Sequence, residues 1–148
     1  MTPMELFLEY FNAFELTYVD DDWSRLEPLF SPSAVYRIRG SGSLDADIEG
    51  REAIFAAIRR FLDGFDRQCS RELRSLSAPV VDGNTVSIDG VAAYRRGDSP
   101  ELLLKLVEEI EFHDGLIVTI TDHYSKEVNE AFGEWMARWG QGLNPSYV

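Results

Sequence analysis

The stretch Leu104–Tyr124, LKLVEEIEFHDGLIVTITDHY, decides the fold because it carries two apolar stripes with a period of two residues. Before the central turn, alternate residues are apolar except Glu108, and after it they are apolar except Asp122. Alternate residues of a strand share one face, so each acid is expected on a face that is otherwise buried. A buried carboxyl group must find a partner, shift its pKa or line a cavity. The two strands therefore predict a pocket.

The turn between the stripes allows two pairings of the strands. A two-residue loop, Asp114-Gly115, pairs His113 with Leu116 and leaves the two acids on opposite faces. A three-residue loop with Gly115 in the left-handed region pairs Phe112 with Leu116 and places both stripes on one face. Because burial specifies register strongly, the sequence favours the three-residue loop.

This register makes the two acids diagonal neighbours. Glu108 then lies opposite Ile120, and Leu106 lies opposite Asp122, with the Cβ atoms of the acids about 7 Å apart. Two carboxyl groups this close in an apolar cleft tend not to ionise together, so one can donate a proton while the other accepts one. In the alternative reading, each acid is neutralised by an arginine. A neighbouring predicted strand supplies Arg67, Arg71 and Arg74.

Composition narrows the class of protein. The 148 residues fit one domain, and 45% hydrophobic and 12% aromatic content is typical of a globular chain. The formal net charge of -12 disfavours a nucleic-acid partner. Cys69 is the only cysteine, and His113 and His123 show no ligand spacing, so we expect no metal and no cofactor. No apolar run is long enough to span a bilayer, and no basic leader is evident, which predicts a cytoplasmic protein with no membrane partner.

Hydrophobic periodicity along the rest of the chain predicts an α+β domain over residues 1–139, followed by a tail over 140–148. Apolar residues recur at helical spacing near both ends, and period-two segments separated by turns fill the second half. The segment 40–47 is rich in Gly, Ser and Asp and is expected to be a mobile loop. The predicted helices span 2–19, 23–30, 50–66 and 126–139, and the predicted strands 34–39, 67–78, 85–96, 101–112 and 116–124.

This order of elements resembles the NTF2-like superfamily, which includes SnoaL-like polyketide cyclases, ketosteroid isomerases and limonene-epoxide hydrolases. The segments that carry the resemblance are DWSRLEPLFSPSAVYRI (22–38), EGREAI (49–54), EIEFHDGLIV (109–118) and ITDHYS (120–125). The resemblance implies a cone in which a curved, mostly antiparallel sheet wraps around the N-terminal helices. It also implies a pocket between sheet and helices, and a homodimer.

The resemblance carries over to a few residues only. Tyr36 and Asp122 fall where limonene-epoxide hydrolases place the tyrosine and aspartate that help to position the attacking water. The asparagine of that family is replaced by Ile38, and its Arg-x-Asp pair by Asp89-Gly90-Val91, so epoxide hydrolysis is disfavoured. Glu108 corresponds to the protonated oxyanion-hole acid of ketosteroid isomerases. The catalytic base of that family falls at position 38, where this chain has Ile38. In SnoaL-like cyclases an aspartate does the acid–base work, and Asp122 is its nearest analogue.

We therefore predict a pocket for a small hydrophobic molecule and a cofactor-independent proton transfer, isomerisation, cyclisation or dehydration of a carbonyl or hydroxyl compound. Asp122 is the expected base, Glu108 the neutral proton donor and Tyr36 a donor to the developing oxyanion. The alternative is a non-catalytic domain that binds a small ligand or a protein. The helix-1 tyrosine of ketosteroid isomerases corresponds to either Tyr10 or Phe14. The expected apolar lining consists of Phe11, Phe14, Ile38, Leu104, Leu106, Ile110, Val118, Ile120 and Tyr124.

Overall fold

The computed structural model describes residues 1–148 and contains three α-helices and seven strands. Short 3-10 turns at Trp23–Arg25 and Glu27–Leu29 replace the predicted second helix. The helices are α1 (Pro3–Asp20), α2 (Arg51–Gly64) and α3 (Lys126–Trp139). The strands are β1 (Phe30–Arg39), β2 (Ala46–Glu49), β3 (Ser70–Ser75), β4 (Val80–Asp82), β5 (Thr85–Arg95), β6 (Leu102–His113) and β7 (Leu116–His123).

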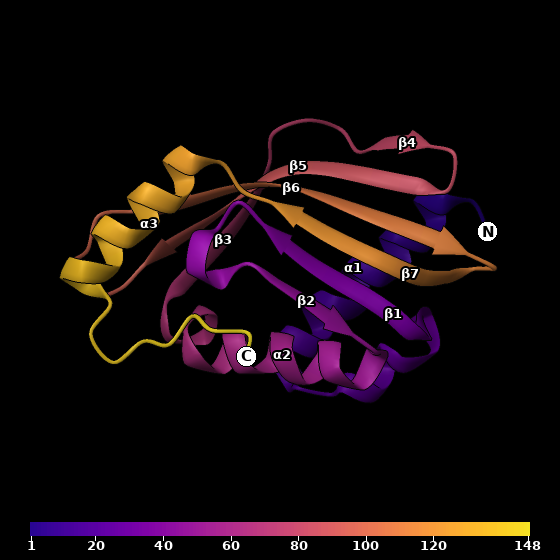
Figure 1. Ribbon diagram of the computed structural model, residues 1–148, viewed down its shortest axis with the longest axis horizontal. Coiled ribbons are helices and arrows are strands. Elements are labelled where there is room, and N and C mark those ends of the chain that lie inside the picture. The colour runs from indigo at the N-terminus through magenta and orange to yellow at the C-terminus, as the bar shows by residue number, and fades with distance from the viewer.

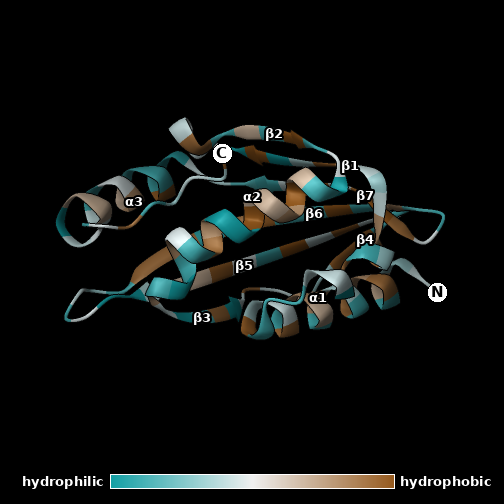
Figure 2. Cartoon of the chain, turned by 90° about the horizontal axis from the view of Figure 1, so that it is seen from below, coloured by the Kyte–Doolittle hydropathy of each residue, from teal (hydrophilic) through white to brown (hydrophobic).

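The strands form one curved sheet in the order β2-β1-β7-β6-β5-β3, with β4 paired to β5 outside this path. Strands β1 and β7 run parallel, and every other pair is antiparallel. Figure 1 shows the sheet arching over α2, with α3 at one end. In Figure 2, α1 and α2 lie across the same side of the sheet. The predicted α+β class, with a curved sheet wrapped around N-terminal helices, is confirmed.

Helix α1 begins with a capping box. The Thr2 side chain accepts a hydrogen bond from the Glu5 backbone N–H, and the Glu5 carboxylate accepts one from the Thr2 backbone N–H. These two bonds satisfy backbone donors that the first turn leaves free. The helix buries Phe7, Tyr10 and Ala13 toward the interior. One face of α1 therefore forms a wall of the space enclosed by the sheet.

The predicted register of the β6–β7 hairpin is wrong. The loop is the two-residue Asp114-Gly115, with φ values of 50° and 76°, and His113 pairs with Leu116. Positive φ at both loop positions is typical of the tight hairpin turns whose twist matches that of the strands. As a result, Glu108 lies directly opposite Asp122, whereas the expected partner of Glu108 was Ile120.

A β-bulge reconciles this tight turn with burial of both acids. Phe112 pairs with Ile117, but the next pair is Glu111 with Thr119, so Val118 is an extra residue with no partner on β6. One extra residue reverses the alternation of faces beyond it. Without the bulge, a two-residue loop would place the acids on opposite faces; with it, both face the interior.

Two strands were not predicted from the sequence pattern, because each has only three or four residues. The expected loop at 40–47 contains a 3-10 turn and leads into β2, which pairs antiparallel with β1. Asp45 fixes the turn by accepting hydrogen bonds from the backbone N–H and hydroxyl of Ser41. Strand β4 is short and exposed, and it joins β5 through a loop at Gly83.

Residues 140–148 pack back onto the domain. Tyr147 is buried, and its ring stacks on Phe61 with centroids 4.6 Å apart and planes at 3°. Arg60 donates a hydrogen bond to the backbone carbonyl of Tyr147 at 2.6 Å. Figure 1 shows the yellow segment returning to the side of α2. This segment therefore contributes an aromatic side chain to the core.

None of the three helices has the length and apolar character that a membrane-spanning segment requires.

Candidate functional site

A cavity of about 190 Å³ lies between the sheet and helices α1 and α2. Hydrophobic side chains make up 14 of its 19 lining residues, and the remainder are charged. A groove of about 330 Å³ adjoins it between α1 and the strands and shares five lining residues with it, Phe11, Leu73, Ala92, Leu106 and Glu108. Phe11 and Leu73 are both more than two-fifths exposed, so they mark the side on which the cavity meets solvent. An apolar hollow with a few polar groups is the usual form of a small-molecule site.

Glu108 and Asp122 occupy one region of this cavity wall. They are directly paired across β6 and β7, and both line the cavity. Asp122 is 4% exposed, while Glu108 keeps partial accessibility because it also lines the adjoining groove. Glu108 is therefore the acid that a ligand entering from the groove meets first.

Burial raises the pKa of Glu108 well above its ordinary value, and the neighbouring charge of Asp122 raises it further. Burial also raises the pKa of Asp122, but hydrogen bonds from Glu108 and Tyr36 act in the opposite direction. A hydrogen bond between two carboxyl groups needs one proton, and these directions place that proton on Glu108. One oxygen of Asp122, Oδ1, has no N–H or hydroxyl donor, so the protonated Glu108 is the group that can supply one. Glu108 is therefore the acid of the pair that holds a proton more readily.

Two tyrosines surround the acid pair. Tyr36 on β1 donates a hydrogen bond from its hydroxyl to Asp122 Oδ2, across the parallel pairing of β1 with β7. Tyr10 on α1 lines the same cavity, and the charges of Glu108 and Asp122 add to the effect of burial in raising its pKa. Tyr10, rather than Phe14, is thus the helix-1 side chain that brings a hydroxyl toward the acids.

The arginines do not neutralise the acid pair. Arg67 pairs with Asp21 and Asp63, and Arg74 pairs with Glu72 and Glu101. No lysine, arginine or histidine lies within ion-pair distance of either Glu108 or Asp122. The reading in which arginines neutralise both acids is therefore wrong, because each arginine finds a nearer carboxylate.

Arg71 instead joins a second polar cluster on the cavity wall. It pairs with Glu15 at 2.9 Å and approaches Asp66 Oδ1 with its Nε at 3.4 Å. Tyr94 donates a hydrogen bond to Asp66 Oδ2 at 2.6 Å. The guanidinium also lies 4.1 Å from the centre of the Tyr18 ring. Sequence reasoning missed this cluster because its members come from four separate elements: α1, the turn after α2, β3 and β5.

The structure brings most of the expected pocket residues together. Ile110 lies in the core at 0% exposure and does not line the cavity. Val118 is displaced from the stripe by the bulge, and fully buried Ile117 takes the inward position. Around the cavity lie Phe11, Phe14, Tyr36, Leu106, Glu108, Ile120, Asp122 and Tyr124.

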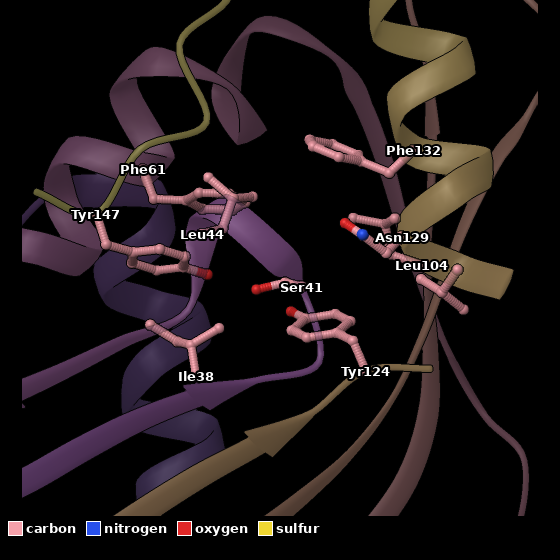
Figure 3. A pocket seen from close by; sticks show the side chains of 10 residues that line it. Ile38, Ser41, Leu44, Phe61, Leu104, Tyr124, Asn129, Phe132 and Tyr147 are labelled. Atoms are coloured by element: carbon pink, nitrogen blue, oxygen red, sulfur yellow. The ribbon is translucent and has the colours of Figure 1, made fainter. Parts of the chain in front are cut away.

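Ile38 and Leu104 line a different, smaller pocket beside α3 (Figure 3). Its volume of about 30 Å³ corresponds to roughly one water molecule, too little for an organic ligand. Phe61, Tyr124 and Tyr147 line both spaces, so these three rings separate the small pocket from the large cavity. In Figure 3 the hydroxyl groups of Tyr147, Tyr124 and Ser41 face the middle of the pocket. Tyr147 had no signal in the sequence pattern, because it follows a segment without periodicity.

No group of three or more His, Cys, Asp or Glu side chains is arranged to hold a metal ion.

Comparison with known proteins identifies the fold. A family model described as a SnoaL-like domain matches residues 7–120. The structure of Bal32a, from a soil-derived mobile gene cassette, is 21% identical, covers 93% of this chain and 99% of its own, and superposes with a TM-score of 0.68. An NTF2-like protein of unknown function from Burkholderia pseudomallei is 18% identical, with 93% and 96% coverage and a TM-score of 0.67.

An epoxide hydrolase of the limonene-epoxide hydrolase-like type from M. tuberculosis is 18% identical, with 89% and 90% coverage and a TM-score of 0.59. At these identities the likeness establishes the fold alone. No curated protein matches the sequence.

Proposed function

The chain belongs to the SnoaL-like domain family, and from this premise we propose that it is an enzyme that moves a proton on a hydrophobic carbonyl or hydroxyl compound. The candidate reactions are isomerisation, cyclisation and dehydration, because each of them can be catalysed by one acid and one base. The observation that carries the proposal is the pairing of Glu108 with Asp122 in an apolar cavity without a neutralising cation. Two carboxyl groups whose environments hold different protonation states are suited to opposite roles.

In the proposed reaction, the ionised Asp122 removes a proton from the carbon next to the substrate carbonyl. Glu108, which is neutral and faces the groove, donates a hydrogen bond or its proton to the carbonyl oxygen as negative charge develops there. Tyr36 keeps Asp122 ionised in the resting state through their hydrogen bond. Once Asp122 has taken up the proton, it needs that hydrogen bond less, and the Tyr36 hydroxyl can turn toward the oxyanion.

Solvent deuterium exchange tests this proposal without knowledge of the natural substrate. The protein is incubated in heavy water with aryl methyl ketones, and deuterium incorporation next to the carbonyl is followed by NMR. We expect exchange above the buffer rate in the wild type and a loss of about a hundredfold in Asp122→Asn, which lacks the base. Glu108→Gln keeps a hydrogen-bond donor but no transferable proton, so a smaller loss is expected.

Glu109→Gln is the matched control, because Glu109 is the next residue of β6, lies on the opposite face and contacts His123 at 3.2 Å. This variant should exchange at the wild-type rate. If Asp122→Asn retains full exchange, Asp122 is not the base. If the wild type binds the ketones without any exchange, the alternative of a non-catalytic binding domain takes the place of the enzyme.

We also propose that the protein forms a homodimer through the outer face of its sheet. Leu103 and Val107 lie on the outward face of β6 and are 43% and 38% exposed. Light scattering coupled to size exclusion should give twice the chain mass, and Val107→Glu should give a monomer. A wild-type monomer across the micromolar range would contradict the dimer.

A further inference from the structure

The groove beside the cavity extends the site toward the β3 edge of the sheet. It is lined by residues of β3, β5 and β6 and by Phe11 of α1, and five of its lining residues also line the cavity. Within the sheet, Glu108 is paired with Ile88 of the groove on one side and with Asp122 on the other. A molecule held at the acid pair therefore reaches the groove directly at Glu108.

The groove is hollow because β5 carries small residues where it faces the helices. On this face of the strand, Gly90 and Ala92 lie among larger side chains, namely Val86, Ile88 and Tyr94. A Cβ atom at position 90 would have one neighbour within 4 Å, the backbone carbonyl oxygen of Arg74 at 3.3 Å. The space above Gly90 is otherwise open, and it belongs to the groove.

The backbone does not require a glycine at position 90. The pairing of β5 with β6 continues without interruption from Thr85 to Tyr94, so there is no bulge at Gly90, and its φ is not positive. A glycine that makes neither a bulge nor a bend inside a strand often marks the close approach of a ligand or another backbone. The Arg74 carbonyl is only slightly closer than ordinary van der Waals contact, so the paired strand leaves room for a side chain. Gly90 therefore leaves space for a ligand.

The polar side chains of the groove already have partners. The Arg74 guanidinium is held by two glutamates at 3.2 and 2.8 Å, and the Ser75 hydroxyl donates to the Ser77 carbonyl at 2.7 Å. Glu108, at the boundary with the cavity, is the remaining polar side chain of the lining. The groove beyond Glu108 therefore favours an apolar group over a charged or hydrogen-bonding one.

The sizes of the two spaces indicate how a substrate divides between them. Ligand pockets usually enclose about 300–1,000 Å³, and the cavity of about 190 Å³ lies below this range by itself. The groove of about 330 Å³ brings the joined site into the range. Phe11 and Leu73 at its rim are 41% and 42% exposed, so one side of the groove is open to solvent. A substrate too large for the cavity would place its remaining part in the groove.

We propose that the groove above Gly90 binds an apolar ring of the substrate that takes no part in the reaction, and that Gly90 is a specificity-determining residue because it keeps this space open. The substrate class is then a carbonyl or hydroxyl compound that carries an apolar ring beyond the one nearest its reacting group. This inference rests on the proposed function for the position of the reacting group. The ring subsite rests on the shape and lining of the groove.

Two aryl ketones of different size test the proposal. We would measure by calorimetry the binding of acetophenone and of para-acetylbiphenyl, which adds a second ring. Burial of that ring against the groove walls should give about tenfold tighter binding to the wild type. In Gly90→Val the new side chain fills the groove, so the preference should fall to about twofold or less. Acetophenone should keep its wild-type affinity, because Gly90 does not line the cavity.

Ser87→Val is the matched control, because it places the same side chain on the outward face of β5, where Ser87 is paired with Glu109. It should keep the wild-type preference. Equal affinities of the two ketones for the wild type, no binding of either, or an undiminished preference in Gly90→Val overturns the proposal. If valine at position 90 prevents folding, Ile88→Phe fills the groove from the neighbouring position and must reduce the preference in the same way.

Methyl NMR of the wild type locates the second ring independently of any substitution. Ile88 lines the groove and not the cavity, so its methyl resonances should move more with para-acetylbiphenyl than with acetophenone. Equal shifts overturn the proposal.

Deuterium exchange into the acetyl group, measured in the same samples, separates this inference from the proposed function. Glu108→Gln should lower exchange and keep the preference for the larger ketone, whereas Gly90→Val should lose the preference and keep the exchange of acetophenone. A preference without any exchange in the wild type leaves the ring subsite standing and removes the enzyme. Exchange without a preference does the reverse.

Discussion

Glu108 and Asp122 face each other directly across β6 and β7, and they do so only because Val118 interrupts the pairing with a bulge. The tight Asp114-Gly115 turn sets one alternation of faces, and the bulge resets it before the acids are reached. The acid pair is thus a product of backbone geometry at the end of the hairpin. Substitutions in the turn and substitutions of the acids therefore test two different parts of this arrangement.

Replacing Gly115 should destabilise the hairpin. Gly115 has a φ of 76°, and a side chain in the left-handed region costs about 1–2 kcal/mol. Gly115→Ala is therefore expected to lower the free energy of unfolding by about 1 kcal/mol in urea denaturation. Gly133→Ala is the control, because Gly133 lies in α3 with open space around its Cα, and alanine there should add about 1 kcal/mol of stability. Equal effects of the two substitutions would show that the turn is not left-handed.

The protonation of Glu108 predicts how stability changes with pH. The pKa of Glu108 is raised in the folded state, so the folded protein holds a proton that the unfolded chain releases above about pH 4.5. The contribution of Glu108 to the free energy of unfolding is complete below that pH, and it is lost as the pH rises toward the pKa of Glu108 in the folded state. The slope is at most about -1.4 kcal/mol per pH unit for one proton. Glu108→Gln should flatten the decline relative to the wild type.

Urea denaturation at a series of pH values measures this difference. Glu109→Gln, on the exposed face, should keep the wild-type slope and serves as the control. Parallel curves for the wild type and Glu108→Gln would mean that Glu108 is ionised in the folded protein at the ordinary pH for a glutamate.

Tyr36→Phe should raise the pKa of Asp122. The Tyr36 hydroxyl donates to Asp122, and that hydrogen bond is one of the three interactions that oppose the effect of burial, beside the hydrogen bond with Glu108 and the charge of His123. Without it, the carboxylate has lost a donor, so the group ionises at a higher pH. Carboxyl-carbon NMR should show this shift, and deuterium exchange should lose activity more at low pH than at high pH. A loss of equal size at every pH would assign Tyr36 to the oxyanion alone.

The sequence predicts the fold and the burial of Glu108 and Asp122 on one face of the sheet. It does not predict the strand register or the side-chain partners. Period-two stripes identify β6 and β7, because burial of one face imposes that spacing. A bulge leaves no mark in such a pattern. The predicted pairing of β6 with β7 was therefore wrong, because it took no account of the extra residue, Val118. Strand β2 was missed because it has only four residues, follows a segment rich in Gly, Ser and Asp, and gains its order from pairing with β1. The partners of Arg71 could not be found either, since long side chains choose among acids that only the folded chain brings near.

The ring of Tyr147 is expected to limit the size of the cavity. Its ring stacks on Phe61, meets Tyr36 edge-on at 5.8 Å and separates the cavity from the small pocket beside α3. Tyr147→Ala should join the two spaces and lower the free energy of unfolding by about 3 kcal/mol, the usual cost of removing a buried aromatic ring. Tyr147→Phe keeps the ring and should cost about 1 kcal/mol.

Binding of ketones with one or two aromatic rings measures the size of the cavity in these variants. The alanine variant should gain affinity for compounds too long for the wild type, and the phenylalanine variant should not. Because both variants lose the hydroxyl group, a gain shared by both would assign the effect to the loss of that hydroxyl rather than to added space. A gain in the alanine variant alone identifies the ring as the end wall of the site.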